Sequence, residues 1–110
     1  MQVKFTARKF RAHQEIKDHA LAAVEKLGRY YDGIVHADII LSYERVTKSV
    51  KMAEINLHVF GVVLSAKEKS DHFTKSIDAV AEKLVTQLEK YKTRLRAKDK
   101  NKVRSLQAKI

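Results

Sequence analysis

The sequence predicts an α+β fold with the element order β-α-β-β-β-α, in which two helices pack on one face of a four-stranded sheet. Two observations lead to this prediction. Apolar and polar residues alternate in four short runs, which is the period of strands, and apolar residues recur every three to four positions in two longer runs, which is the period of helices. The absence of proline, internal repeats and a Gly/Ser-rich linker in 110 residues indicates one folded domain.

The first two predicted elements are a strand and an amphipathic helix. Residues 2–8 alternate, with Val3, Phe5 and Ala7 on the side expected to be half-buried. From about residue 13 to 29 the apolar residues follow helical spacing, and they are Ile16, Ala20, Ala23, Val24 and Leu27. Gly28 lies near the end of this run and is predicted to stop the helix.

Three further runs predict the remaining strands. In residues 35–43 one face is apolar, and it consists of Val35, Ala37, Ile39, Leu41 and Tyr43. In residues 50–60 the corresponding positions are Ile55, Leu57 and Val59. Another alternating run, VVLSAK, follows Gly61, so the glycine is predicted to form a tight hairpin between two strands.

A long helix is predicted after Ser70, with Ser70 or Asp71 as its N-cap. Its apolar stripe consists of Phe73, Ile77, Val80, Leu84, Leu88, Tyr91 and Leu95. Beyond Leu95 the stripe fades, and we interpret that end as a solvated tail or as a frayed helix that orders on binding. The predicted organisation is a domain over residues 1–96 and a basic C-terminal tail over 97–110.

The positive charge is concentrated at the C-terminal end. Of the formal net charge of +10, +8 lies in residues 90–110, which contain nine Lys/Arg and one acidic residue, Asp99. Such an asymmetry favours a nucleic-acid partner over a merely solvated face or an anionic membrane surface. The tail lacks the aromatic and leucine-rich face of an interfacial helix, so no membrane partner is expected.

Helical projection separates the charges of the long helix. Lys83, Lys90 and Arg94 fall on one flank of the apolar stripe, whereas the acidic residues cluster on another side; these are Asp78, Glu82 and Glu89. On the first helix, Lys26 and Arg29 share a flank. If both helices cover the same face of the sheet, these basic flanks are expected to border one groove that suits phosphates.

The sequence offers no catalytic or metal-binding motif. Its histidines are interpreted as scattered surface or boundary residues: His13, His19, His36, His58 and His72. We therefore expect no enzyme activity, metal, cofactor or small-molecule substrate. Phe60 and His58 are the only hint of a base-stacking surface, and an ordinary strand face is favoured there. The lack of cysteine and of a long apolar run favours a cytoplasmic protein.

The segment GVVLSAKEKSDHFTKSIDAVAEKLVTQLEKYKTRL resembles the signature region of the bacterial ribosome hibernation promoting factor and ribosome-associated inhibitor family, short form. The positions that carry the resemblance are Gly61, Ala66, Asp71, Phe73, Ile77, Asp78, Lys83, Leu84, Gln87, Leu88, Lys90 and Lys92. The stretches MQVKFTAR, KLGRYYD and ADIILSYERV are also similar, so the resemblance extends from residue 1 to about 96.

The resemblance implies a fold similar to double-stranded RNA-binding domains and a ribosome hibernation factor without enzyme activity. It implies binding to the small ribosomal subunit and its 16S rRNA, in the channel used by mRNA and tRNA, and inhibition of translation under stress or in stationary phase. The RNA-binding residues on matching family positions are Lys26, Arg29, Lys83, Lys90 and Lys92, and the expected additions are Arg8, Lys9, Arg11, Arg94 and Arg96.

Departures from the family pattern leave some questions open. Thr86 stands where the family often has an arginine, so a phosphate contact there would fall to Arg94 or Arg96. The family's C-terminal dimerisation domain is absent from these 110 residues, so ribosome pairing is expected to need a separate ribosome-pairing factor. The alternatives are a free-standing module that binds structured RNA outside the ribosome, and a protein-interaction domain whose binding tolerates salt.

Overall fold

The computed structural model describes the backbone of residues 1–45 and 49–108 and the side chains within that range up to residue 95. Its elements are β1 (Gln2–Ala7), α1 (Gln14–Tyr30), β2 (Ile34–Tyr43), β3 (Lys51–Val59), β4 (Val62–Ser70) and α2 (Phe73–Ala108). The predicted β-α-β-β-β-α order is confirmed.

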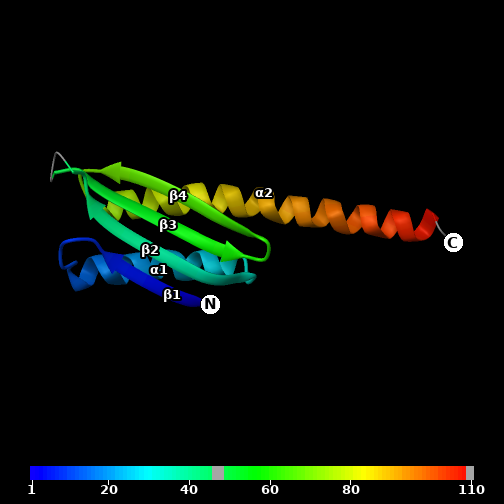
Figure 1. The fold of residues 1–110 in the computed structure, drawn as a ribbon, viewed down its shortest axis with the longest axis horizontal. Helices are drawn as coiled ribbons and strands as arrows, with labels where there is room; N and C mark the ends of the chain where they lie inside the picture. Colours follow the sequence, from blue (N-terminus) through cyan, green and yellow to red (C-terminus); the bar gives the residue numbers. More distant parts are fainter. Residues whose placement is uncertain (46–48, 109–110) are drawn as a thin grey trace.

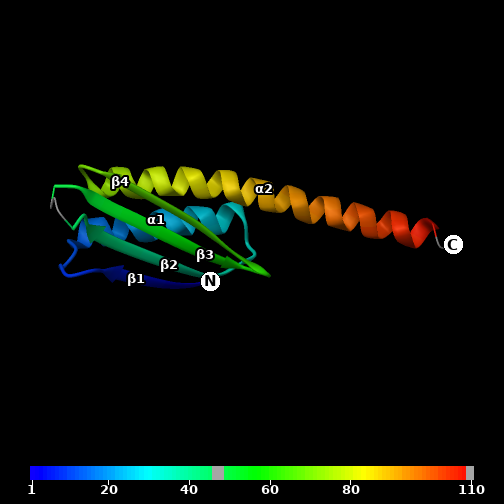
Figure 2. The ribbon, with the colours of Figure 1, turned by 45° about the horizontal axis from the view of Figure 1, so that its top comes forward.

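The four strands form one sheet in the order β1-β2-β3-β4. β1 runs parallel to β2 through the α1 crossover, and the other neighbours are antiparallel. Both helices cover the same face of this sheet, as predicted, so the opposite face has no helix over it (Figures 1 and 2). We call that opposite side the outer face of the sheet.

The core lies between the sheet and the two helices. In register across the sheet, Phe5 pairs with Ile39, Ile39 with Ile55, and Ile55 with Ala66, which gives one apolar row beneath the helices. The α2 stripe meets this row, and its buried members are Phe73, Ile77, Val80, Leu84 and Leu88. Each large side chain of this kind contributes roughly 1.5–3 kcal/mol on full burial, so the predicted stripe, with its spacing of three to four residues, is the main attachment of α2.

The beginning of β2 differs from the prediction at Val35. Ile34 pairs with Val59 but His36 pairs with His58, so Val35 is an extra residue in an irregular register. Ile34 is buried, whereas Val35 is 66% exposed. The prediction that Val35 shares the core face was therefore wrong, because a bulge places Ile34 there instead.

The β3–β4 connection confirms the predicted hairpin. Val59 pairs with Val62, so Phe60 and Gly61 alone form the turn. Gly61 has a φ of 80°, a conformation that residues with a Cβ rarely adopt. The side chain of Phe60 is 89% exposed at the tip.

The C-terminal end of α1 and the N-terminal end of α2 differ from the predicted positions. Gly28 lies inside α1, which continues to Tyr30, and the Tyr31 amide donates to the Leu27 carbonyl at 3.0 Å. A Cβ at Gly28 would lie 3.0 Å from the Met1 methyl carbon, so the glycine permits close packing rather than a stop. α2 begins at Phe73, later than the predicted Ser70 or Asp71 caps, and its first turn holds no acidic residue.

The outline of the molecule is elongated because α2 is much longer than the sheet. The 36 residues of α2 continue well past the β3–β4 turn, and the principal extents are 63 × 24 × 18 Å (Figure 1). The helix continues to Ala108, past the residue at which the predicted tail begins. Among the described helices, none is both long and apolar enough to cross a membrane.

Candidate nucleic-acid interface

The groove between α1 and α2 carries mixed charge. Its lining includes His19 and Lys26 from α1 and Asp78 and Glu82 from α2. His19 Nε2 lies 2.7 Å from an Asp78 carboxylate oxygen. The acidic flank of α2 thus faces α1, and the prediction of one groove bordered by the basic flanks of both helices was wrong.

Lys83 lies on the other side of α2. Its ammonium group forms an ion pair with Glu68 of β4, and 56% of the Lys83 side chain remains exposed. Helical periodicity correctly predicted which side of α2 carries Lys83. The packing of α2 against β4 determines which residue lies next to it. The partner carboxylate partly neutralises this lysine.

A second group of residues joins the end of α1 to α2. The Lys92 ammonium lies 4.6 Å from the centroid of the Tyr30 ring and donates to the Tyr30 carbonyl at 3.5 Å. The Tyr91 hydroxyl donates to the Phe60 carbonyl at 2.9 Å, which brings the β3–β4 turn to the same end. We call this region the basic–aromatic end; it consists of Lys26, Arg29, Tyr30, Phe60 and Lys92.

The basic–aromatic end offers cations and exposed rings together. Arg29 is exposed and pairs with Glu25 at 3.4 Å across one helical turn. Tyr30 is 38% exposed and Phe60 89% exposed, so both rings are accessible. Tyr30 was missed by the sequence analysis, because a tyrosine at the end of an amphipathic helix gives no periodic signal of exposure.

Two further predicted residues lie on α2, one on each side of Lys92 in the sequence, and a third has no described side chain. Lys90 and Arg94 are exposed. Among residues with described side chains, no acid lies within ion-pair distance of either one. Arg96 falls within α2, but its side chain lies outside the described set.

The N-terminal candidates lie elsewhere. Arg8, Lys9 and Arg11 are exposed in the segment between β1 and α1, and Lys9 adopts a φ of 62°. The 17 residues of α1 separate this segment from the basic–aromatic end. That helix spans about 25 Å at 1.5 Å per residue, so these three residues form a region separate from the basic–aromatic end.

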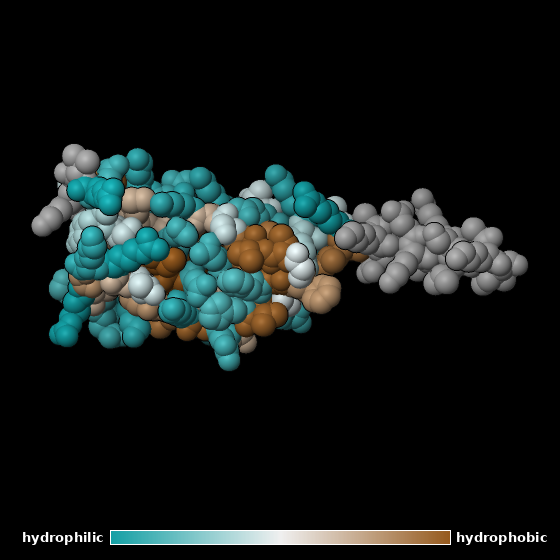
Figure 3. Space-filling model, in the orientation of Figure 1, coloured by the Kyte–Doolittle hydropathy of each residue, from teal (hydrophilic) through white to brown (hydrophobic). Residues whose placement is uncertain are grey.

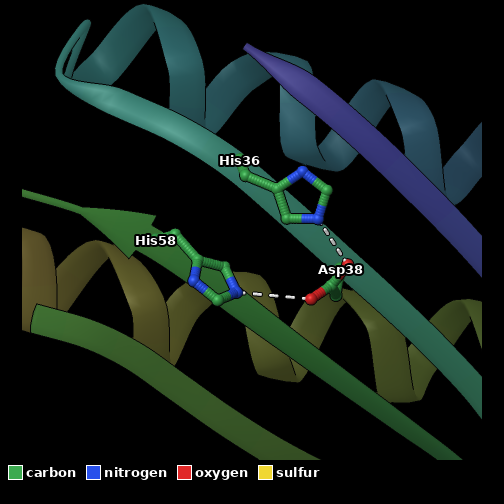
Figure 4. Close-up of side chains that lie close together, drawn as sticks. All are labelled: His36, Asp38 and His58. Atoms are coloured by element: carbon green, nitrogen blue, oxygen red, sulfur yellow. Dashed lines mark hydrogen bonds and ion pairs between the residues drawn. The ribbon is translucent and has the colours of Figure 1, made fainter.

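The outer face of the sheet holds a cluster that the sequence analysis did not find. His36 Nε2 lies 2.6 Å from one oxygen of Asp38, and His58 Nε2 lies 3.3 Å from the other (Figure 4). The hydrogen bond from His36 is the main cause that lowers the pKa of Asp38; desolvation opposes it and His58 reinforces it. The interpretation of the histidines as scattered was wrong for this pair.

The outer face is otherwise largely polar. Figure 3 shows hydrophilic atoms over most of this side and an apolar area toward the end where β3 and β4 turn. Exposed apolar residues near that end include Val35, Val62 and Val63. The sheet also carries exposed cations, which are Lys4, Lys67 and Lys69.

The described residues form a small α+β domain that carries exposed cations and exposed aromatic rings together at one end of its helices, an arrangement that suits binding to nucleic acid. A model of the family described as Sigma 54 modulation protein / S30EA ribosomal protein matches residues 3–96. The chain belongs to this family, which confirms the family resemblance seen in the sequence.

Individual relatives agree with this assignment. The chain is 31% identical to the ribosome hibernation promoting factor of Klebsiella oxytoca over 87% of this chain and 98% of that one. It is 28% identical to the Escherichia coli K12 protein of the same name, with the same coverage. These relatives are hibernation factors rather than enzymes, in agreement with the expected lack of enzyme activity.

Solved structures show the same fold. A ribosomal subunit interface protein from Coxiella burnetii superposes with a TM-score of 0.76 at 25% identity, covering 84% of this chain and 99% of that one. The N-terminal domain of Thermus thermophilus Protein Y gives a TM-score of 0.71 at 26% identity, covering 83% and 99%.

Proposed function

We propose that this protein is a cytoplasmic ribosome hibernation factor that binds the small ribosomal subunit at the mRNA/tRNA channel and inhibits translation under stress or in stationary phase. The observation that supports it best is the family match over residues 3–96, together with relatives named ribosome hibernation promoting factor. The subunit interface protein of similar fold points to the same partner.

The basic–aromatic end and the neighbouring Lys90 and Arg94 are the proposed contact with 16S rRNA. Cations that reach phosphates release condensed counterions, and exposed rings such as Tyr30 and Phe60 offer surfaces on which unpaired bases stack. Arg8, Lys9 and Arg11 would form a second contact at the far end of α1. Two contacts about 25 Å apart would let the protein span an extended RNA surface.

The test is cosedimentation with purified small subunits over a series of salt concentrations. The variant Lys90→Gln, Lys92→Gln, Arg94→Gln removes three charges from the proposed contact. A matched control, Lys4→Gln, Lys67→Gln, Lys69→Gln, removes three charges from exposed residues of the sheet. We expect the first variant to weaken binding and to lower the salt slope by about 0.7–0.9 for each phosphate that is no longer neutralised, and the control to change both much less.

Equal losses in the two variants would show attraction by net charge alone and would overturn the site assignment. Affinity for naked duplex RNA equal to that for small subunits would instead favour a structured-RNA-binding module outside the ribosome. Binding that barely weakens as salt rises would favour a protein-interaction domain. A sucrose-gradient profile of stationary-phase ribosomes, with and without the protein, reports how much of the material is present as subunits, single ribosomes and dimers.

A further inference from the structure

Three potential metal ligands meet on the outer face of the sheet, on the side away from both helices. His36 and Asp38 are two residues apart on β2, so their side chains leave the same face. His58 on β3 is the direct cross-strand partner of His36. The strand register alone therefore brings two imidazoles and one carboxylate together.

The three side chains already point toward one another. Both imidazole rings turn an Nε2 atom to the Asp38 carboxylate, each to a different oxygen (Figure 4). One ligand atom from each residue lies within 4.8 Å of the other two. In a tetrahedral site with bonds of about 2.0–2.1 Å, ligand atoms lie about 3.3 Å apart, so an ion would need only modest side-chain movement.

The three side chains are exposed enough for an ion to reach them from solution. The exposed fractions of the side chains are 32% for His36, 27% for Asp38 and 42% for His58. The cluster is therefore reachable by solvent, and a water molecule can complete the coordination. Strands in the centre of the sheet hold the ligands, so little backbone order has to be gained on binding.

We propose that His36, Asp38 and His58 bind one divalent transition-metal ion of the zinc class, with water as the remaining ligand. Two neutral imidazoles and a carboxylate suit Zn²⁺, Co²⁺ or Ni²⁺ better than Mg²⁺ or Ca²⁺, which prefer oxygen ligands. When the ion binds, each ring gives up its Nε2–H hydrogen bond to Asp38, carries its proton on Nδ1 instead, and ligates through the lone pair of Nε2. The bound ion joins β2 to β3 on the outer face, and this site does not depend on the proposed ribosomal function.

The test measures the binding of Zn²⁺ to the full chain by isothermal titration calorimetry. The chain carries no histidine tag, and Zn²⁺ alone is the probe. We expect one ion per chain, a raised melting temperature in zinc, and visible absorption typical of tetrahedral coordination when Co²⁺ replaces Zn²⁺. His36→Gln, His58→Gln and Asp38→Asn should each weaken zinc affinity by about tenfold or more. Circular dichroism confirms that each variant is folded.

His19→Gln is the matched control, because His19 and Asp78 form an equally close pair at 2.7 Å without a second imidazole. This variant should bind zinc within about twofold of the unmodified chain, since it removes no proposed ligand. Saturable binding that is weakened tenfold or more only in the three cluster variants supports the proposal. No saturable binding, or an equal loss in His19→Gln, overturns it.

Discussion

The Lys92 ammonium on α2 lies over the Tyr30 ring at the end of α1, 4.6 Å from the ring centroid. This contact ties the two helices together at the end where α2 leaves the sheet. It also holds a cation and an accessible ring side by side, which is the combination expected of a surface that binds single-stranded or irregular RNA.

A double-mutant cycle measures this contact. We expect Lys92→Met and Tyr30→Leu to show a coupling free energy of about 0.5–1 kcal/mol in urea unfolding, the usual range for an exposed cation–π pair. Additive effects, with coupling below about 0.3 kcal/mol, would mean that the proximity does not stabilise the fold.

The ion pair between Lys83 and Glu68 leads to a prediction that a substitution strengthens binding to small subunits. If Lys83 contacts rRNA phosphates, Glu68→Gln removes its partner carboxylate and should strengthen binding to small subunits. Exposed pairs are worth about 0.2–1 kcal/mol, so the expected gain is about 1.4- to 5-fold. Cosedimentation at moderate salt measures it. Glu25→Gln is the positive comparison, because it releases Arg29 of the basic–aromatic end in the same way and should give a similar gain. A gain in Glu25→Gln but none in Glu68→Gln would place Lys83 outside the contact.

The hydroxyl of Ser76 is a buried polar group whose loss should be costly. Ser76 is fully buried, and its Oγ donates to the Lys51 carbonyl at 2.7 Å. Ser76→Ala leaves that carbonyl without this donor, so we expect a loss of about 1–3 kcal/mol in the free energy of unfolding. Thr93→Ala is the control, because the Thr93 hydroxyl donates to the Glu89 backbone carbonyl on an exposed helix face. That change should be neutral or slightly stabilising, and equal losses would contradict the prediction.

Tyr31 makes stability depend on alkaline pH. Burial first, and then the neighbouring Tyr91 hydroxyl and Asp32, raise the pKa of the Tyr31 phenol. The folded state therefore favours the neutral phenol, and its contribution to stability is complete below about pH 10 and is lost as pH rises through the raised pKa. Urea unfolding between pH 9 and about 11 should show a shallower decline for Tyr31→Phe. Tyr30→Phe is the control, and an unchanged decline in Tyr31→Phe would contradict the assignment.

The fold was predictable because each element has its own period. The stripe from Phe73 to Leu88 and the alternation of Ile55, Leu57 and Val59 identified the buried faces correctly. The exceptions are local. The bulge at Val35 shifts the strand alternation by one residue, and Gly28 lies inside α1, where its lack of a Cβ permits Met1 to approach closely. Neither event leaves a periodic signal in the sequence.

The candidate sites were less predictable because they depend on neighbours from other elements. Helical projection placed Lys83 and Asp78 on different flanks, but only the packing of α2 decides that Asp78 faces α1 and Lys83 faces β4. Likewise, the spacing of His36 and Asp38 is visible in the sequence, whereas the approach of His58 requires the register of β2 and β3. Charge composition predicted a polyanion partner without locating its contact.

The C-terminal charges beyond residue 97 are predicted to add affinity without choosing the binding site. Residues 98–110 contain five Lys/Arg and one acid, and they lie outside the family match to residues 3–96. Deleting them should weaken binding to small subunits and flatten its salt dependence by about 0.7–0.9 for each phosphate that these residues neutralise.

The pattern of 16S rRNA protection from chemical probes should stay the same, because the contacts proposed to set the position lie before residue 97. Changing Lys98, Lys100 and Lys102 to Gln in the full chain separates charge from length and should give part of the same reduction in affinity. A shifted protection pattern in either variant would contradict the prediction, because it would show that this segment selects the binding site. Electrostatic attraction is screened beyond a Debye length of about 8–10 Å, so it is expected to add affinity only near the segment.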